Sequence, residues 1–97
     1  MTPYRVRYTA VAAESIRHLH PSVKQALREA IRTLASDPFR GHPLTLELTG
    51  FRSLRISRYR VIYRIQESDR AVEIHLAGAR KDIYEVFRQF LERTLRA

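Results

Sequence analysis

The chain has 97 residues, of which 44% are apolar and 29% charged, as is typical of one small globular domain over residues 1–97. It has no cysteine, which excludes disulfides, thiolate zinc sites and cysteine nucleophiles, and its apolar runs are far shorter than the roughly 20 residues that span a bilayer. The formal net charge of +8 predicts a polyanion or an acidic protein as partner. The N-terminal residues lack the apolar segment of a signal peptide, so we expect a cytoplasmic protein that does not associate with membranes.

The first third of the chain predicts one strand and two helices. Apolar and aromatic residues alternate with arginine over residues 3–8, which is the period of a half-buried strand. Thr9 can cap a helix over residues 10–18. The run Ser22-Val-Lys-Gln25 is a capping-box pattern, so we expect a second helix to begin there and to end before Asp37-Pro38.

The remainder of the chain predicts a loop, three strands and a last helix. Residues 38–50 contain two prolines and two glycines and are expected to form a loop with at most a turn or a short strand. Strands follow over residues 52–57, 59–66 and 72–77, the last with Val72, Ile74 and Leu76 facing inward, and a helix begins near Lys81. The order β-α-α-β-β-β-α predicts an α+β domain with a small, largely antiparallel four-stranded sheet and helices packed on one face.

The strand over residues 59–66 alternates two kinds of side chain. Aromatic and aliphatic residues share one parity: Tyr59, Val61, Tyr63 and Ile65. Arg60 and Arg64 lie on the other parity, within a segment from Thr49 to Gln66 that has five arginines and no acid. Because successive residues of a strand point to opposite faces, we expect the first set in the core and the arginines in a row on the opposite face. Such fixed guanidinium groups suit phosphates.

Further polar residues are predicted to converge on this arginine face. They come from three segments and comprise Arg55, Arg60, Arg64, Glu73, His75, Arg80 and Tyr84. One interpretation is a nucleic-acid-binding surface. The other is a solvated face whose arginines pair with Glu73, with Tyr84 as ordinary helix surface.

Cleavage of RNA on such a surface would need three groups. A base deprotonates the 2′-hydroxyl, a cation stabilises the phosphorane and an acid protonates the leaving 5′-oxygen. Arginine can serve as the cation, but it is always protonated and is therefore a poor base. The conventional proton-transfer groups are His42, His75 and Tyr84, which form no recognisable pair, and no histidine spacing predicts a metal site. We expect no cofactor, and only modest catalysis unless something else positions the substrate.

Two further stretches carry a family resemblance. They are Leu54-Arg-Ile-Ser-Arg-Tyr-Arg-Val-Ile-Tyr63 and Val72-Glu-Ile-His-Leu-Ala-Gly-Ala-Arg-Lys-Asp-Ile-Tyr84. With the opening Tyr4-Arg-Val-Arg-Tyr-Thr9 and the segment Leu34-Ala-Ser-Asp-Pro-Phe-Arg-Gly-His-Pro-Leu44, they resemble the RelE/ParE superfamily of bacterial toxins over nearly the whole chain. The resemblance implies a toxin of a type II toxin–antitoxin pair. The RelE branch cleaves mRNA in the ribosomal A site, and the ParE branch poisons DNA gyrase.

Matched position by position, the resemblance implies roles for four residues. Arg60 resembles the arginine that stabilises the transition-state phosphate, and Arg80 the arginine that stabilises the leaving group or acts as acid. Tyr84 matches the tyrosine that orients or stacks on the mRNA, and Arg55 falls where a basic residue lies near the 2′-hydroxyl. A wider set is expected to contact nucleic acid: Arg52, Arg58, Arg64, His75 and Lys81.

The chain departs from the family pattern at three places. Many relatives have a histidine just before the position of Arg80, where this chain has Ala79, and a basic residue where it has Ser53. The usual hairpin glycine near Ser57-Arg58 is also missing. The retained Arg60, Arg80 and Tyr84 favour the RelE branch, so we expect a metal-independent, ribosome-dependent mRNA endonuclease. The alternatives are a ParE-like gyrase poison and a non-catalytic member that binds nucleic acid or antitoxin.

The partners implied by the resemblance are an acidic antitoxin, the ribosome and mRNA. We expect the free toxin to be a monomer and its antitoxin complex a hetero-oligomer. The last helix has an apolar stripe at Phe87, Phe90, Leu91 and Leu95, which could hold an amphipathic antitoxin segment. Alternatively the stripe closes the domain's own core, above all at Val86 and Phe87.

Overall fold

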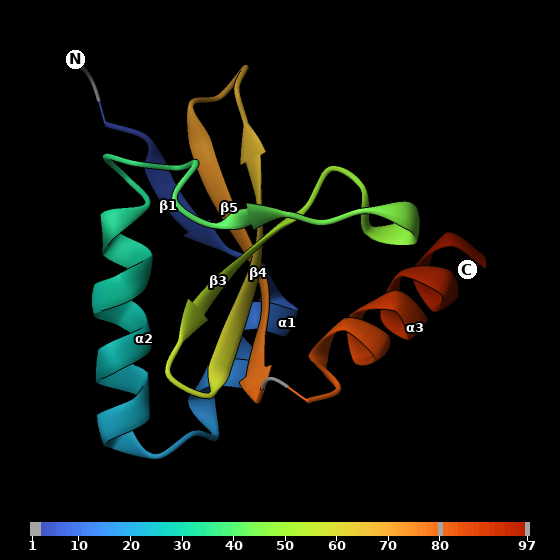
Figure 1. Cartoon of the computed structure of the whole chain (residues 1–97), viewed down its shortest axis with the longest axis horizontal. Helices are drawn as coiled ribbons and strands as arrows, with labels where there is room; N and C mark the ends of the chain where they lie inside the picture. The colour runs from blue at the N-terminus through green and yellow to red at the C-terminus, as the bar shows by residue number, and fades with distance from the viewer. Residues whose placement is uncertain (1–2, 80, 97) are drawn as a thin grey trace.

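A mixed five-stranded sheet with helices on both sides forms the structure, a computed structural model that describes residues 3–79 and 81–96. Its elements in chain order are β1 (Arg5–Tyr8), α1 (Ala10–Arg17), α2 (Pro21–Thr33), β2 (His42–Pro43), a 3-10 turn (Leu46–Leu48), β3 (Arg52–Ile56), β4 (Tyr59–Gln66), β5 (Ala71–Ala79) and α3 (Ile83–Arg96) (Figure 1). The α+β class and the predicted order of elements are confirmed. No helix in the described ranges is long and apolar enough to cross a membrane.

The sheet contains one strand more than the four predicted. Its order is β1-β5-β4-β3-β2, with β1 parallel to β5 and the other neighbours antiparallel. The added strand is β2, in which His42 pairs with Ser53 and Pro43 with Arg52. This strand lies in the segment predicted as a loop with at most a short strand. It extends the sheet beyond β3 and brings residues 38–43 against it.

The helices cover both faces of the sheet, which corrects the expectation that they pack on one face. Helices α1 and α2 cover the face that carries Val61 and Tyr63, and the alternation predicted for β4 is confirmed there. Helix α3 packs on the opposite face, where Ile83 and Phe87 are buried against Ile62. Ile62 lies between two arginines in the sequence, yet it is fully buried, because the apolar stripe of α3 needs an apolar partner.

A β-bulge in β5 changes which of its residues face α1 and α2. Along β4, Ile62 is paired with Leu76 while the next residue, Tyr63, is paired with Ile74, so His75 is an extra residue on β5. The alternation therefore reverses at the bulge. Leu76, predicted to face inward with Ile74, instead packs on the α3 face, and Ala77 takes the buried position on the α1–α2 face.

The helix ends follow local capping rules, with one correction. The hydroxyl of Thr9 accepts the Ala12 amide at 3.0 Å and caps α1, as predicted. Helix α2 begins at Pro21 rather than at the capping box proposed for Ser22. The Nδ1 of His20 accepts the Ser22 amide at 3.1 Å, and proline at the first helical position has no amide hydrogen to satisfy.

Candidate functional site

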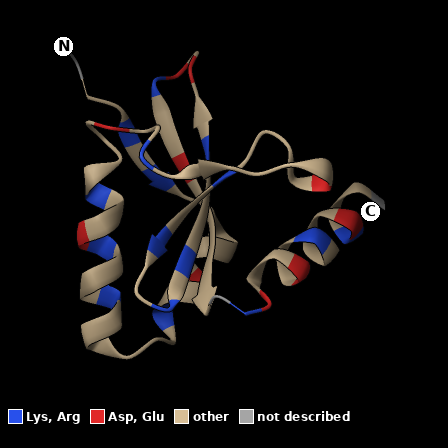
Figure 2. Ribbon diagram, viewed as in Figure 1, with Lys and Arg blue, Asp and Glu red and all other residues tan. Residues whose placement is uncertain are grey.

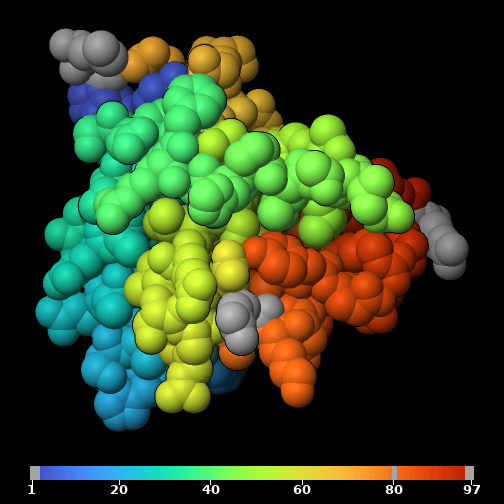
Figure 3. All heavy atoms as spheres, viewed as in Figure 1, coloured from blue at the N-terminus to red at the C-terminus, as the bar shows by residue number. Residues whose placement is uncertain are grey.

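Arg55, Arg60 and Tyr84 come together on the α3 face, at the end of the sheet nearest the β3–β4 hairpin. Arg55 on β3 is paired with Arg60 on β4, so both side chains point to the same face. The guanidinium carbon of Arg60 lies 6.0 Å from the centre of the Tyr84 ring. In Figure 3 the hairpin (yellow) and the first turns of α3 (orange) lie side by side on one surface. Arg80, the fourth predicted catalytic residue, lies outside the described residues.

The charge around Arg60 is unbalanced. Within the described residues no carboxylate forms an ion pair with Arg55 or Arg60, and the Nε of Arg60 is buried without a hydrogen-bond partner. Figure 2 shows basic residues along the β3–β4 hairpin, whereas the turn between β4 and β5 at the opposite end of the sheet carries acidic residues together with a basic one. A guanidinium that no acid neutralises can bind a phosphate without first breaking an ion pair.

Arg64 has a different environment from Arg60, although both lie on the same face of β4. Its Nη2 is 3.4 Å from a carboxylate oxygen of Glu73, and its guanidinium carbon lies 5.6 Å from the centre of the Phe51 ring. Glu73 also accepts hydrogen bonds from Arg7 on the neighbouring β1, the shorter at 2.7 Å. Burial alone would raise the pKa of Glu73, but the hydrogen bonds from Arg7, Gln66 and His75 outweigh it and lower the pKa. The ion-paired interpretation therefore describes Arg64 but not Arg60.

Tyr84 is held in place by a residue that the sequence analysis considered only as a departure from the family. It follows the buried Ile83 in the first turn of α3, so its ring leans over the sheet beside Arg60. Its hydroxyl lies 2.8 Å from the Oγ of Ser53, which is 1% exposed. Nothing in the local sequence of Ser53 indicates this contact, because it depends on where α3 packs.

His75 does not lie with the arginine pair, although it was proposed as a nucleic-acid contact. It is the extra residue of the β5 bulge and forms edge contacts with Phe51 and Phe87, at ring-centre distances of 5.1 and 6.0 Å. Burial among these rings lowers the pKa of His75, and this outweighs the opposing effect of Glu73, whose carboxylate lies 3.4 Å from Nε2. These contacts describe a packed neutral imidazole rather than a group presented to a substrate.

The other residues predicted to contact nucleic acid differ in whether their side chains are exposed or already hydrogen-bonded within the protein. Arg52 donates from Nη2 to the carbonyl oxygens of Phe39 and Gly41, at 3.1 and 2.7 Å, so its main contacts hold the loop before β2. Arg58 in the hairpin turn and Lys81 before α3 are exposed. In residues 3–79 and 81–96, no group of three or more His, Asp and Glu side chains is arranged to hold a metal ion.

Comparisons with known proteins show which family the chain resembles. Residues 6–84 match the family model described as ParE toxin of type II toxin-antitoxin system, parDE. The chain is 39% identical to Toxin RelG of Mycobacterium tuberculosis over 84 residues, covering 84% of this chain and 97% of RelG. It is 38% identical to Toxin RelE of the same organism over 78 residues, covering 77% of this chain and 80% of that protein.

Solved structures share the fold. The toxin–antitoxin complex RelBE2 from M. tuberculosis matches with a TM-score of 0.76 and 36% identity, over 80% of this chain and 99% of that chain. The isolated Escherichia coli RelE toxin matches with a TM-score of 0.70 over 94% of this chain and 98% of that chain, but at 17% identity it supports the fold alone.

The fold and the matches define a toxin of a type II toxin–antitoxin system. The chain belongs to the RelE/ParE family, and the curated relatives that it matches are RelE-type toxins.

Proposed function

We propose that this toxin is a ribosome-dependent mRNA endonuclease that cleaves the message in the A site and so inhibits translation. The observation that carries the proposal is the arginine pair. Arg55 and Arg60 lie opposite each other beside Tyr84, with no ion pair to a carboxylate among the described residues. A surface of two free guanidinium groups and one aromatic ring suits a single-stranded RNA whose phosphate and base are both bound.

Each residue has a distinct role in the proposed reaction. Arg60 stabilises the charge that develops on the phosphorane, and Arg55 lies where it can bind beside the 2′-hydroxyl. Tyr84 stacks on a base or orients it, and Arg80 stabilises the leaving 5′-oxygen or acts as acid. No metal takes part in the proposed mechanism. These roles follow the match to the family motif, supported by the proximity of Arg55, Arg60 and Tyr84.

Dependence on the ribosome follows from the weakness of the acid–base groups. His75 is packed between two aromatic rings, and arginine is a poor base. His42 is exposed on β2, where it pairs with Ser53. A site of this kind gains most of its rate if another body holds the RNA in a reactive geometry, and the ribosome can do so.

The test compares Arg60→Ala with Arg64→Ala in a cell-free translation reaction, with mRNA 5′ ends mapped by primer extension. We expect A-site cuts that need ribosomes, a loss of roughly a hundredfold or more in Arg60→Ala, and a loss of only a fewfold in Arg64→Ala. Cleavage of naked RNA at the same rate would contradict ribosome dependence. Intact message together with poisoned supercoiling by DNA gyrase would favour the ParE-type activity instead.

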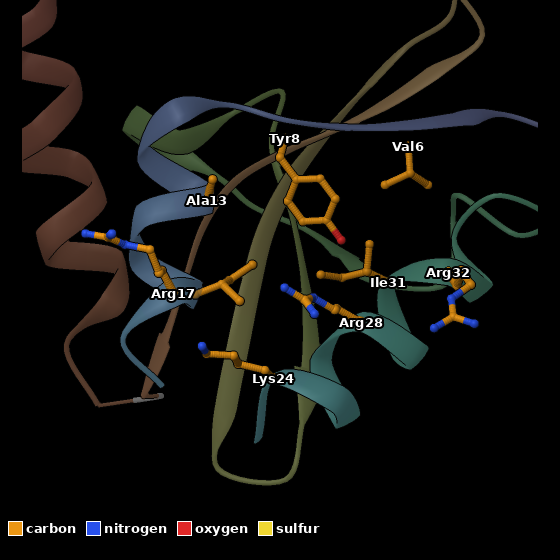
Figure 4. Close-up of a pocket in the computed structure, with 9 residues that line it drawn as sticks. Val6, Tyr8, Ala13, Arg17, Lys24, Arg28, Ile31 and Arg32 are labelled. Atoms are coloured by element: carbon orange, nitrogen blue, oxygen red, sulfur yellow. The ribbon is translucent and has the colours of Figure 1, made fainter. Parts of the chain in front are cut away.

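The acidic antitoxin proposed as partner has a suitable surface on the other side of the sheet. A groove of about 630 Å³ lies between β1, α1 and α2. Val6, Ile16 and Ile31 contribute apolar surface to it, and Figure 4 shows Tyr8 pointing from β1 toward Ile31 and Arg28 on α2. Four basic side chains complete its lining: Arg17, Lys24, Arg28 and Arg32. An apolar floor with a basic rim fits an amphipathic segment that carries acids on its flanks.

This groove is a better candidate for the antitoxin than the stripe on α3. Phe87 is fully buried in the toxin's own core, which confirms the self-packing interpretation for that residue. Val86, assigned to the core by the same interpretation, is 46% exposed, and Leu95 is 83% exposed. Phe90 and Leu91 are half-buried against the same core, so no groove is described along α3 like the one between β1, α1 and α2. Antitoxin complexes are known for related toxins, among them RelBE2.

Charge reversal at the groove tests this assignment. The double variant Arg28→Glu/Arg32→Glu should bind the cognate antitoxin at least about tenfold more weakly, because it places like charges of the toxin and the acidic antitoxin against each other, which costs several kcal/mol. Arg93→Glu, an exposed substitution on α3, is the matched control and should bind normally. Isothermal titration calorimetry with the purified antitoxin measures both. Equal affinity of the groove variant and the wild type would move the antitoxin to another surface.

A further inference from the structure

Ser53 has a buried hydroxyl that forms a hydrogen bond with a residue of the candidate site. It lies on β3 in the middle of the α3 face and is the one buried polar residue in the described core. A buried hydroxyl needs a hydrogen-bond partner, and here that partner is the Tyr84 hydroxyl at 2.8 Å. The pair therefore ties together two segments that are 31 residues apart in the sequence.

The Ser53 end of this pair is rigid. Ser53 is paired with Ile62 on β4 and with His42 on β2, so strands flank it on both sides. Gly41 approaches so closely that a Cβ at that position would lie 2.5 Å from the Ser53 carbonyl oxygen. Strand pairing on both sides and the contact with Gly41 restrict movement of the Ser53 backbone. The hydroxyl of Ser53 is therefore a fixed point on the floor of the site.

The Tyr84 end, by contrast, depends on this contact. Tyr84 is half-buried in the first turn of α3, and the residues that anchor this turn to the sheet are Ile83 and Phe87. Its ring also lies 6.0 Å from the guanidinium carbon of Arg60, a distance at which a cation–π contact is weak. The hydrogen bond to Ser53 is thus the directional contact that sets the angle of the ring.

We propose that Ser53 is a positioning residue for Tyr84, and that it fixes the aromatic ring at a set distance from Arg60 so that a base and its phosphate bind together. This inference rests on the proposed function, because the orientation of the Tyr84 ring can affect the rate of cleavage only if the toxin cleaves mRNA. Here a neutral hydroxyl orders a group that contacts substrate, instead of contacting the substrate as a charge.

A double-mutant cycle on ribosome-bound mRNA tests the coupling. Ser53→Ala and Tyr84→Phe each remove the hydrogen bond and keep the ring, and each should lower kcat by about tenfold with little change in KM. The double variant should be no slower than the slower single variant, because both changes remove the same contact. If Ser53→Ala slows cleavage by the same factor in the Tyr84→Phe background, Ser53 acts through something else and the inference is wrong.

A second measurement separates this inference from the proposed function. The ring resonances of Tyr84 in the free protein should shift or broaden in Ser53→Ala, while those of Tyr4, whose hydroxyl donates to Glu67 in the turn between β4 and β5, stay unchanged as the internal control. Unchanged Tyr84 signals would overturn the positioning role even if the toxin cleaves mRNA. A wild-type toxin that cuts no message would overturn the proposed function, and the ring signals would still decide whether Ser53 orients Tyr84. If Ser53→Ala does not fold, Ser53→Cys keeps a side chain of similar shape with a much weaker hydrogen-bonding group, and its kcat and its Tyr84 ring signals decide the question.

Discussion

Arg55 and Arg60 face each other directly across the β3–β4 hairpin, as a pair of like charges on one face of the sheet. Like charges at directly opposed positions destabilise an antiparallel pair. No carboxylate in residues 3–79 or 81–96 forms an ion pair with either of them. Among the residues that the structure describes, the side chain of Arg55 forms one hydrogen bond, from Nε to the Ser57 carbonyl oxygen at 3.2 Å. The pair therefore opposes folding, and an anionic ligand between the two guanidinium groups would relieve the repulsion.

Replacing Arg55 should thus stabilise the fold and weaken the function. Arg55→Thr removes the repulsion and places a β-branched residue in a strand, so the free energy of unfolding should rise by about 0.2–1 kcal/mol. Cleavage of ribosome-bound mRNA should fall by roughly tenfold or more, because the cation proposed to bind beside the 2′-hydroxyl is lost. Urea unfolding and primer extension measure the two effects. Arg58→Thr in the adjacent turn is the control for stability, since turn residues have no opposed partner. A less stable Arg55→Thr would show that the pair does not repel.

Arg60 and Arg64 should respond differently to lysine. Arg60→Lys keeps the charge but loses the planar fork that binds two phosphate oxygens, so we expect a loss of roughly tenfold to a hundredfold in cleavage. Arg64→Lys keeps a charge beside Glu73, at the place of its present ion pair, and should cost a fewfold at most. Measured side by side in the translation assay, equal losses for the two variants would mean that the ion pair does not distinguish these arginines.

The sequence predicted those features of the fold that depend on the alternation of residues within one strand or on the residues next to a helix end. The alternation in β4 predicted Tyr63 in the core and Arg60 on the opposite face, and both positions are confirmed. Thr9 capped α1 as expected, because a cap depends on the residues next to it. The capping-box pattern at Ser22 did not predict that α2 begins at Pro21, although proline is favourable at the first position of a helix.

The features that the sequence did not reveal depend on contacts between distant segments. The bulge at His75 reversed the alternation in β5, and only the pairing with β4 defines it. The sequence does not distinguish Arg52 from the other arginines of the segment, because its hydrogen bonds go to carbonyl oxygens of the loop before β2. Ser53 was interpreted as the loss of a charge, whereas the packing of α3 makes it the partner of Tyr84. Alternation indicates a face, but it does not indicate what covers that face.

The close approach of β2 to β3 should make Gly41 intolerant of a side chain. A Cβ at Gly41 would lie 2.5 Å from the Ser53 carbonyl oxygen and 2.7 Å from the Tyr63 hydroxyl, which accepts the Gly41 amide and donates to Pro38. We expect Gly41→Ala to lower the free energy of unfolding by about 1–3 kcal/mol. Gly78→Ala is the matched control, because its Cβ would meet Ile83 at an ordinary 3.5 Å, and it should stay within about 0.5 kcal/mol of wild type. Chemical denaturation measures both, and equal stabilities would mean that β2 can move away from β3 at little cost.

His75 should make the stability of the toxin depend on pH in mildly acidic solution. Burial lowers its pKa in the folded state, so the unfolded chain takes up a proton more readily than the folded one. Stability is then complete above the ordinary pKa of about 6.5 and is lost as the pH falls below it toward the folded-state value. The lowered pKa of Glu73 acts in the same direction, but only below the ordinary carboxyl pKa, in more acidic solution.

The variant His75→Phe keeps a ring between Phe51 and Phe87 and cannot titrate. The fall in unfolding free energy between about pH 7.5 and about pH 5.5 should therefore be smaller in His75→Phe than in wild type. An identical fall in both proteins would mean that another group takes up the proton on unfolding.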